Sequence, residues 1–133
     1  MTPDLQAMGE EKFVSLTTFR KDGSPVSTPV WVASTPEGLV VTTPAGSHKV
    51  KRLRRRAEAT LQPCSRRGTV APGAPTASAT VEIIEPPDAA GTKRAVDALS
   101  SKYGLEYRAV LGLEKLVTLA RRRSGERVIL RLT

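Results

Sequence analysis

The sequence is poor in the residues from which metal sites and histidine-based catalytic centres are built. Its 133 residues include one cysteine, Cys64, and one histidine, His48. One cysteine cannot form a disulfide within the chain, and a zinc cluster needs several Cys or His ligands, so we expect no metal site. A catalytic triad could use only His48, which follows Ser47 and precedes Lys49. We expect that side chain to be solvated or to contact an anion, and we identify no catalytic residue.

Long hydrophobic runs are also absent. No apolar stretch approaches the roughly 20 residues that cross a bilayer, and the first residues have neither the basic nor the apolar region of a secretory signal. These absences predict a cytoplasmic protein that does not associate with membranes. No Gly-x-Gly-x-x-Gly or phosphate-loop pattern occurs, which argues against a βαβ nucleotide-binding fold.

Positive charge is what the chain has in excess. With 21 Lys and Arg residues against 13 Asp and Glu, its formal net charge is +8. Candidate partners are nucleic acid, an anionic membrane surface or a polyanionic small molecule, and solvated arginines are the alternative that needs no partner. Only 4% of the residues are aromatic, and none lies within the basic segment 47–56. Base stacking therefore has little support, which disfavours nucleic acid, and with no membrane partner expected a polyanionic small molecule is the favoured partner.

Alternating apolar residues predict a mainly β domain of about six strands. Turn signals at residues 21–24 and 35–38 join the first three strands into an antiparallel meander. On the second strand, Val26, Thr28, Val30 and Val32 share one face. The predicted strands span residues 13–20, 26–32, 39–43, 59–63, 77–85 and 128–132.

Four helices are expected around these strands. They cover residues 3–9, 47–57, 86–102 and 105–121. Ser47 is placed to cap the second helix, whose apolar positions Val50, Leu53 and Ala57 face the core. Hairpin-connected strands with late helices indicate an antiparallel barrel or curled sheet, and residues 1–133 suit a single domain.

Residues 42–52 suit a phosphate, because a strand end and a tight loop lead into a helix start that is followed by cations. The free N–H groups and the dipole of a helix start favour an anion by about 0.3–1 kcal/mol. A charge-assisted hydrogen bond is worth roughly 1.5–3 kcal/mol, so side chains should dominate the affinity. Helical geometry favours Lys49 as the phosphate ligand, with Thr43 and Ser47 as further contacts.

The other cations of this helix are weaker candidates. Lys51 points away from Lys49 on a helical projection, and Arg52 is a secondary candidate for the phosphate. Residues 54–56 are three arginines that we expect to be solvated.

Four stretches with a characteristic order and spacing support a family resemblance. They are LTTFRKDG at 16–23, PVSTPVWV at 25–32, VTT at 41–43 with SHKVKRL at 47–53, and ATLQPC at 59–64. They resemble the split β-barrel flavin and deazaflavin oxidoreductases, the superfamily of pyridoxamine-phosphate oxidase and its F420-dependent relatives. The later Tyr103-Gly104 pair looks like members of the F420-associated branch.

The resemblance implies an α+β, mainly β split β-barrel with helices packed outside. It also implies a homodimer with the cofactor at the subunit interface, its ring against the second strand and its phosphate at the loop before the second helix. For Trp31, core or dimer packing is an equal alternative. The resemblance thereby implies Thr28, Pro29, Val30 and Trp31 near the ring. Together with the phosphate segment, the expected cofactor-binding residues are Thr28, Pro29, Val30, Trp31, Thr42, Thr43, Ser47, Lys49, Lys51 and Arg52.

The choice of cofactor depends on a departure from the family pattern. Pyridoxamine-phosphate oxidases carry an arginine and a lysine in the second-strand motif, where this chain has TPVWVA at 28–33. This difference weakens FMN and argues against a vitamin B6 phosphate as substrate. F420 has a phosphodiester and a glutamyl tail, so its negative charges follow an extended path. An extended track of cations suits F420 better than it suits the compact monophosphate of FMN. The track consists of Lys49, Lys51, Arg52 and either Arg20 or Lys21.

The sequence therefore predicts an F420H2-dependent oxidoreductase that transfers a hydride between F420 and a small organic substrate. Three alternatives stay open. They are an FMN protein of the same fold, an F420-binding protein without turnover and, least favoured, a nucleic-acid-binding module.

Overall fold

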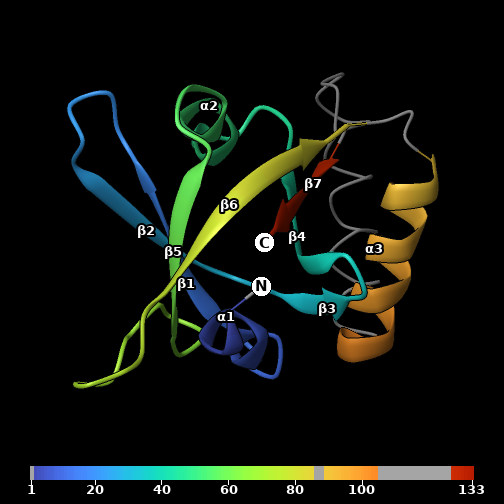
Figure 1. Cartoon of the computed structure of the whole chain (residues 1–133), viewed down its shortest axis with the longest axis horizontal. Helices are drawn as coiled ribbons and strands as arrows, with labels where there is room; N and C mark the ends of the chain where they lie inside the picture. Colours follow the sequence, from blue (N-terminus) through green and yellow to red (C-terminus); the bar gives the residue numbers. More distant parts are fainter. Residues whose placement is uncertain (1, 86–88, 105–126) are drawn as a thin grey trace.

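An antiparallel sheet of seven strands forms the body of the protein in a computed structural model that describes residues 2–85, 89–104 and 127–133. The strand order is β2-β1-β5-β6-β7-β4-β3, and three described helices lie outside the sheet (Figure 1). The strands are β1 (Val14–Phe19), β2 (Pro25–Val30), β3 (Ala33–Thr35), β4 (Gly38–Pro44), β5 (Glu58–Pro63), β6 (Ala77–Ile84) and β7 (Arg127–Leu132). The helices are α1 (Pro3–Met8), α2 (His48–Arg55) and α3 (Ala89–Tyr103).

The two edge strands of the sheet are consecutive in the chain. β2 ends at Val30 and β3 begins at Ala33, so only Trp31 and Val32 join the opposite edges. A link of this length spans at most about 11 Å. The sheet must therefore curl until its edges approach each other at this link, where Figure 1 shows β2 running on into β3. This geometry confirms the expected split barrel.

The expected meander of three strands is wrong. β1 pairs with β2 as predicted, with Val14 opposite Val30, but β2 has no further neighbour in the sheet. β3, which the sequence pattern did not reveal, pairs with β4, and the other neighbour of β4 is β7. Turn signals describe neighbours along the chain, whereas the pairing of β4 with β7 joins distant segments, such as Thr42 and Ile129, which are 87 residues apart.

The main core lies inside the curled sheet and is closed by two helices. Leu5 and Met8 of α1 and Val50 and Leu53 of α2 are buried against the apolar faces of the strands. Ala57, expected on the same face as Leu53, is instead exposed because α2 ends at Arg55 and the chain turns into β5.

A second cluster lies between the other face of the sheet and α3. Because alternate residues of a strand point to opposite faces, Val40 faces this cluster while Val41 faces the main core. Ala95 and Leu99 of α3 are fully buried there, as the helical spacing predicts.

Hydroxyl groups cap the starts of two helices, and Ser47 does so as predicted. The hydroxyl of Thr2 accepts a hydrogen bond from the Leu5 N–H at 3.2 Å, and that of Ser47 accepts one from the Val50 N–H at 3.4 Å. Gly104 follows α3 with a φ of +58°, a conformation that glycine adopts readily. The helix expected over residues 105–121 lies outside the described residues.

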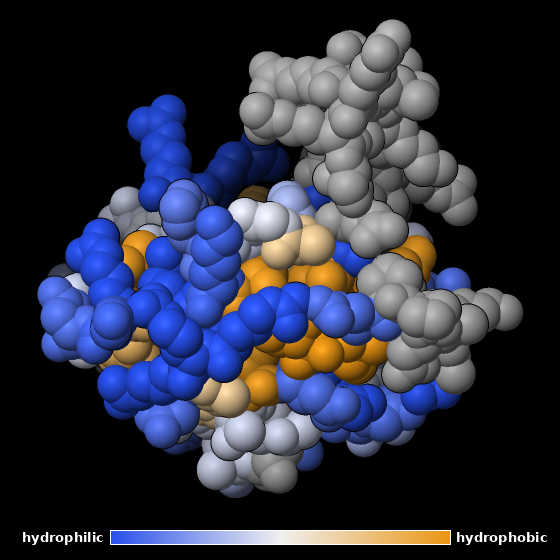
Figure 2. Space-filling view, turned by 90° about the horizontal axis from the view of Figure 1, so that it is seen from above, coloured by the Kyte–Doolittle hydropathy of each residue, from blue (hydrophilic) through white to orange (hydrophobic). Residues whose placement is uncertain are grey.

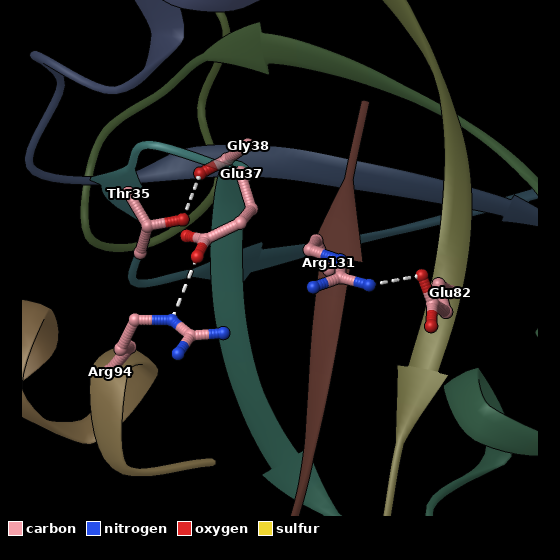
Figure 3. A network of polar contacts seen from close by, with 6 residues as sticks. All are labelled: Thr35, Glu37, Gly38, Glu82, Arg94 and Arg131. Carbon is pink, nitrogen blue, oxygen red and sulfur yellow. Dashed lines mark hydrogen bonds and ion pairs between the residues drawn. The ribbon is translucent and has the colours of Figure 1, made fainter. Parts of the chain in front are cut away.

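Polar contacts fasten the outer surface (Figure 3). Arg131 of β7 donates to Glu82 of β6 at 2.5 Å, across the pair that the register places opposite each other. An ion pair of 2.8 Å between Arg94 and Glu37 ties α3 to the turn between β3 and β4. In the described part of the chain, no helix has the length and apolarity needed to cross a membrane.

Candidate cofactor-binding site

The end of β4 and the start of α2 bring several candidate ligands together. Thr43 is buried, and its hydroxyl lies 3.3 Å from that of Ser47. Because Ser47 caps α2, the free N–H groups of the first helical turn open next to these two hydroxyls. This arrangement offers neutral donors to an anion.

Lys49 in the first turn of α2 lies within the electrostatic influence of two further cations, Arg52 and Arg127. Lys49 is half-buried, and burial, followed by the positive charges of Arg52 and Arg127, lowers the pKa of its ammonium below the ordinary value. No carboxylate among the described residues pairs with Lys49. Positive charge gathered around a lysine that has no carboxylate partner among the described residues favours an anionic ligand.

Arg127 is the member of this group that the sequence analysis missed. From the start of β7, its Nε donates to the Thr42 hydroxyl at 3.0 Å and its Nη2 to the Thr42 carbonyl at 3.1 Å. The guanidinium thus fixes the strand end that carries Thr43. The only sequence signal for Arg127 is its place at the start of the last strand, and it becomes meaningful only once β7 is known to pair with β4.

A second group of cations lies on the other side of Arg52. The Nε of Arg52 donates to the buried hydroxyl of Thr18 at 2.6 Å, which ties α2 to β1. Burial, followed by the charges of Arg20 and Arg55, lowers the pKa of Arg52. Arg52 therefore stands between the cations around Lys49 and those near the β1–β2 turn.

An open hollow of about 610 Å³, here called the basic hollow, lies between α2 and the β1–β2 turn. Figure 2 views the molecule from the side on which α2 lies in Figure 1, where hydrophilic residues cover much of the surface. Six of the seven lining residues are lysine or arginine, and no carboxylate is among them. They are Arg20, Lys21, His48, Lys51, Arg52, Arg54 and Arg55.

The three arginines expected to be solvated are exposed, but two of them have partners. Arg54 forms an ion pair with Glu85, and Arg56 forms one of 3.2 Å with Glu58. Arg56 also lies over the ring of Phe19, 4.4 Å from its centre. These contacts hold the two side chains to the protein surface.

The candidate ring contacts lie at the edge strand β2. Thr28 stands opposite Leu16 of β1, and its hydroxyl is buried without a hydrogen-bond partner among the described residues. A buried hydroxyl without a partner is rare and costs about 1–3 kcal/mol. Val30 packs against the main core, while Pro29 is exposed on the opposite face. Thr28 is therefore the polar group on β2 that a ligand could satisfy.

Trp31 has a packing partner, which fits the alternative role considered for it. Its ring stacks on Tyr103 with the centres 4.9 Å apart and an interplanar angle of 16°. Trp31 thus lies at the second cluster, beside α3. Lys51, the remaining candidate, lines the basic hollow.

Of the phosphate candidates, Thr43 and Ser47 lie together at the helix start, and Lys49 follows in the first turn of α2. Arg52 lies further along α2 and contacts Thr18. Thr42 lies on the opposite face of β4 from Thr43 and is held by Arg127.

Comparison with known proteins identifies the family. The family described as pyridoxamine 5'-phosphate oxidase matches residues 1–133. The chain belongs to this family. The resemblance found in the sequence is thereby confirmed, and no curated protein matches the chain.

Solved structures share the fold of this pyridoxamine 5'-phosphate oxidase family member at low identity. HutZ, the heme storage protein of Vibrio cholerae, aligns with a TM-score of 0.68 and 14% identity over 98% of this chain and 87% of its own. The conserved hypothetical protein Rv2991 of Mycobacterium tuberculosis aligns with a TM-score of 0.66 and 20% identity over 100% of this chain and 80% of its own. A structure described as an F420 reductase aligns with a TM-score of 0.55 and 18% identity over 100% of this chain and 96% of its own. At these identities the likeness concerns the fold.

Proposed function

We propose that this pyridoxamine 5'-phosphate oxidase family member is an oxidoreductase that binds F420 and transfers a hydride between it and a small organic substrate. The observation that carries the proposal is the Ser47-capped start of α2 with Lys49 in its first turn, where the charges of Arg52 and Arg127 act on Lys49 and no carboxylate of the described residues neutralises it. Bound F420 would supply the hydride chemistry, and the protein supplies binding, orientation and electrostatics.

The residues at the helix start fit a phosphate group. Lys49 offers an ammonium, Ser47 and Thr43 offer hydroxyls, and the first turn of α2 offers backbone N–H groups. Arg127 contributes by holding Thr42 and by adding positive charge beside Lys49. Since each charge-assisted hydrogen bond is worth roughly 1.5–3 kcal/mol, these groups together suit a ligand bound at micromolar concentration.

The residues on β2 fit the ring of such a ligand. The unpaired hydroxyl of Thr28 would regain a hydrogen bond from a polar edge of a heterocycle. Trp31, three residues further along the chain, presents an aromatic surface that is already held on one face by Tyr103. We assign no catalytic residue, because binding and orientation suffice for a hydride transfer between a cofactor and a substrate held in contact.

The basic hollow favours F420 over FMN. Arg52 belongs both to the cations around Lys49 and to the hollow, so an extended polyanion can pass from one to the other. The glutamyl tail of F420 carries carboxylates beyond its phosphodiester, whereas FMN ends at one phosphate. Lys51, Arg52, Arg20 and Lys21 would bind this tail, and FMN would leave most of these charges without a role.

We further propose that residues 1–133 act as one cofactor-binding domain and that two copies form a homodimer. β2 is an edge strand whose outward residues, Pro25, Ser27 and Pro29, are exposed. A second subunit on this edge would cover the residues expected around the ring and complete the site.

Parallel fluorescence titrations with F420, FMN and the deazaflavin chromophore that lacks both phosphate and tail test the proposal. We expect micromolar binding of F420, with FMN at least about tenfold weaker and the bare chromophore weaker still. Failure of F420 to bind at micromolar concentration would overturn the proposal. Tight FMN binding would instead identify a flavin protein, and F420 binding without hydride transfer to any acceptor a non-catalytic binder.

A further inference from the structure

Two consecutive residues at the C-terminal end of α3 hold the segment that joins β2 to β3. This segment, here called the link, consists of Trp31 and Val32. The hydroxyl of Tyr103 accepts a hydrogen bond from the N–H of Val32 at 3.0 Å. It also lies 2.8 Å from the carbonyl of Val32 and 2.7 Å from that of Lys12, to which it can donate. Tyr103 thereby serves a backbone segment that lies 71 residues away in the chain.

Lys102 reinforces the same link from the neighbouring position. Its ammonium donates to the carbonyls of Val32 and Gly9, each at 2.7 Å, and to that of Glu11. Three carbonyls around one ammonium satisfy all three of its donors. The end of α3, the loop after α1 and the link are thus joined at one point.

The link needs such partners because it belongs to neither strand. Residues within a sheet satisfy their backbone groups through the ladder, but Val32 lies between β2 and β3 and is fully buried. Buried backbone groups without partners are costly, so Tyr103 and Lys102 replace the missing ladder. The stack of Trp31 on Tyr103 then fixes the indole beside this anchored backbone.

We infer that Tyr103 and Lys102 are positioning residues that set the conformation of Trp31 and, through it, the affinity of the cofactor site. The second half of this inference rests on the proposed function, in which Trp31 lines the ring pocket. The first half concerns the free protein alone. Both residues act through the backbone of Val32 and the ring of Trp31 and do not themselves contact the ligand.

Trp31 is the only tryptophan in the chain, so its fluorescence reports on this contact directly. Tyr103→Phe keeps the stack but removes the hydroxyl, and Lys102→Met keeps the aliphatic stem but removes the ammonium. Arg94→Met is a matched control on α3, because it removes the ion pair with Glu37 and does not touch the link. Each variant is tested for acrylamide quenching of Trp31 in the free protein and for its Kd with F420.

We expect Tyr103→Phe and Lys102→Met to make Trp31 more accessible to acrylamide and to weaken F420 binding roughly three- to tenfold, the effect of one or two lost hydrogen bonds. Lys102→Arg, which keeps the charge but spreads its donors over a planar guanidinium, should restore both values only in part. Arg94→Met should change neither the quenching of Trp31 nor the Kd for F420, although the loss of the ion pair with Glu37 attaches α3 less firmly.

Unchanged quenching in both variants, at unchanged circular dichroism, would overturn the inference. Equal changes in Arg94→Met would also overturn it, because they would show a general effect of α3 docking. If the unaltered protein does not bind F420, the proposed function fails, and the quenching data still decide whether Tyr103 and Lys102 hold Trp31. Altered quenching with an unchanged Kd would overturn only the second half of the inference, that the conformation of Trp31 sets the affinity for F420.

Discussion

Replacement of Lys49 by methionine should separate binding from stability. Methionine keeps a flexible chain of similar length that can pack where the half-buried lysine stem lies, but it removes the ammonium. In the free protein this ammonium is partly desolvated and stands near Arg52 and Arg127 with no carboxylate partner among the described residues. The substitution therefore removes an unfavourable charge from the free protein and a favourable contact from the complex.

The expected loss of affinity follows from the value of one charge-assisted hydrogen bond. At roughly 1.5–3 kcal/mol, removing it should raise the Kd for F420 about 10- to 150-fold. The free protein should melt at a higher temperature than the unaltered protein. A residue that improves binding at the expense of stability is characteristic of a ligand site.

The pH dependence provides a second test of the same group. Burial, and then the charges of Arg52 and Arg127, lower the pKa of Lys49 in the folded protein below its ordinary value of 10.5. The unfolded chain thus binds the proton more tightly, and the folded state gains stability as pH rises through the interval below 10.5. Anion binding needs the protonated form, so the affinity for F420 should fall as pH rises through the same interval, and Lys49→Arg should flatten this profile.

The assay combines fluorescence titration with thermal unfolding, and Arg67→Met is the matched control. Arg67 is an exposed cation in the loop after β5 that does not line the basic hollow, so its loss changes the net charge equally. The reasoning is refuted if Lys49→Met binds F420 within a factor of about two of the unaltered protein, or if Arg67→Met weakens binding as much. The second result would mean that net charge, and not a contact, attracts the ligand.

Three further substitutions test single features of the fold and site. Thr28→Val removes the unpaired buried hydroxyl, so urea unfolding should show a gain of about 1 kcal/mol while F420 binding weakens; a loss of stability would contradict this interpretation. Gly38→Ala should lower the unfolding free energy by about 1–3 kcal/mol, because φ is +145° there and an added Cβ would lie 2.6 Å from the Leu132 carbonyl oxygen; an unchanged urea midpoint would disprove it. Ser47→Ala removes the cap of α2 and should cost about 0.5–2 kcal/mol in thermal unfolding and also weaken F420 binding; an effect on neither would argue against this helix start as the phosphate site.

Features specified by neighbouring residues could be predicted from the sequence. The hairpin of β1 and β2 follows from alternation and a turn, and the start of α2 follows from Ser47 as its cap. The phosphate candidates Thr43, Ser47 and Lys49 lie within seven residues, so local geometry was enough to bring them together.

Features that depend on distant pairing could not be predicted. The role of Arg127 requires that β7 lies beside β4, and the contacts of Lys102 and Tyr103 require that α3 ends next to Val32. Ala57 was misplaced for a related reason. A helical projection does not show where a helix ends, so it placed Ala57 on the apolar face. In the structure α2 ends at Arg55, because the chain then enters β5 and pairs with β1 and β6.

The position of β7 inside the sheet has a consequence for biosynthesis. Before residues 127–132 leave the ribosome, the described strands that precede them form two pieces that β7 has yet to join, β2-β1-β5-β6 and β4-β3. Each piece exposes an edge to which another nascent chain can add. The barrel can therefore close only after β7 is released, and substitutions that weaken β7 should lower the yield of protein through aggregation.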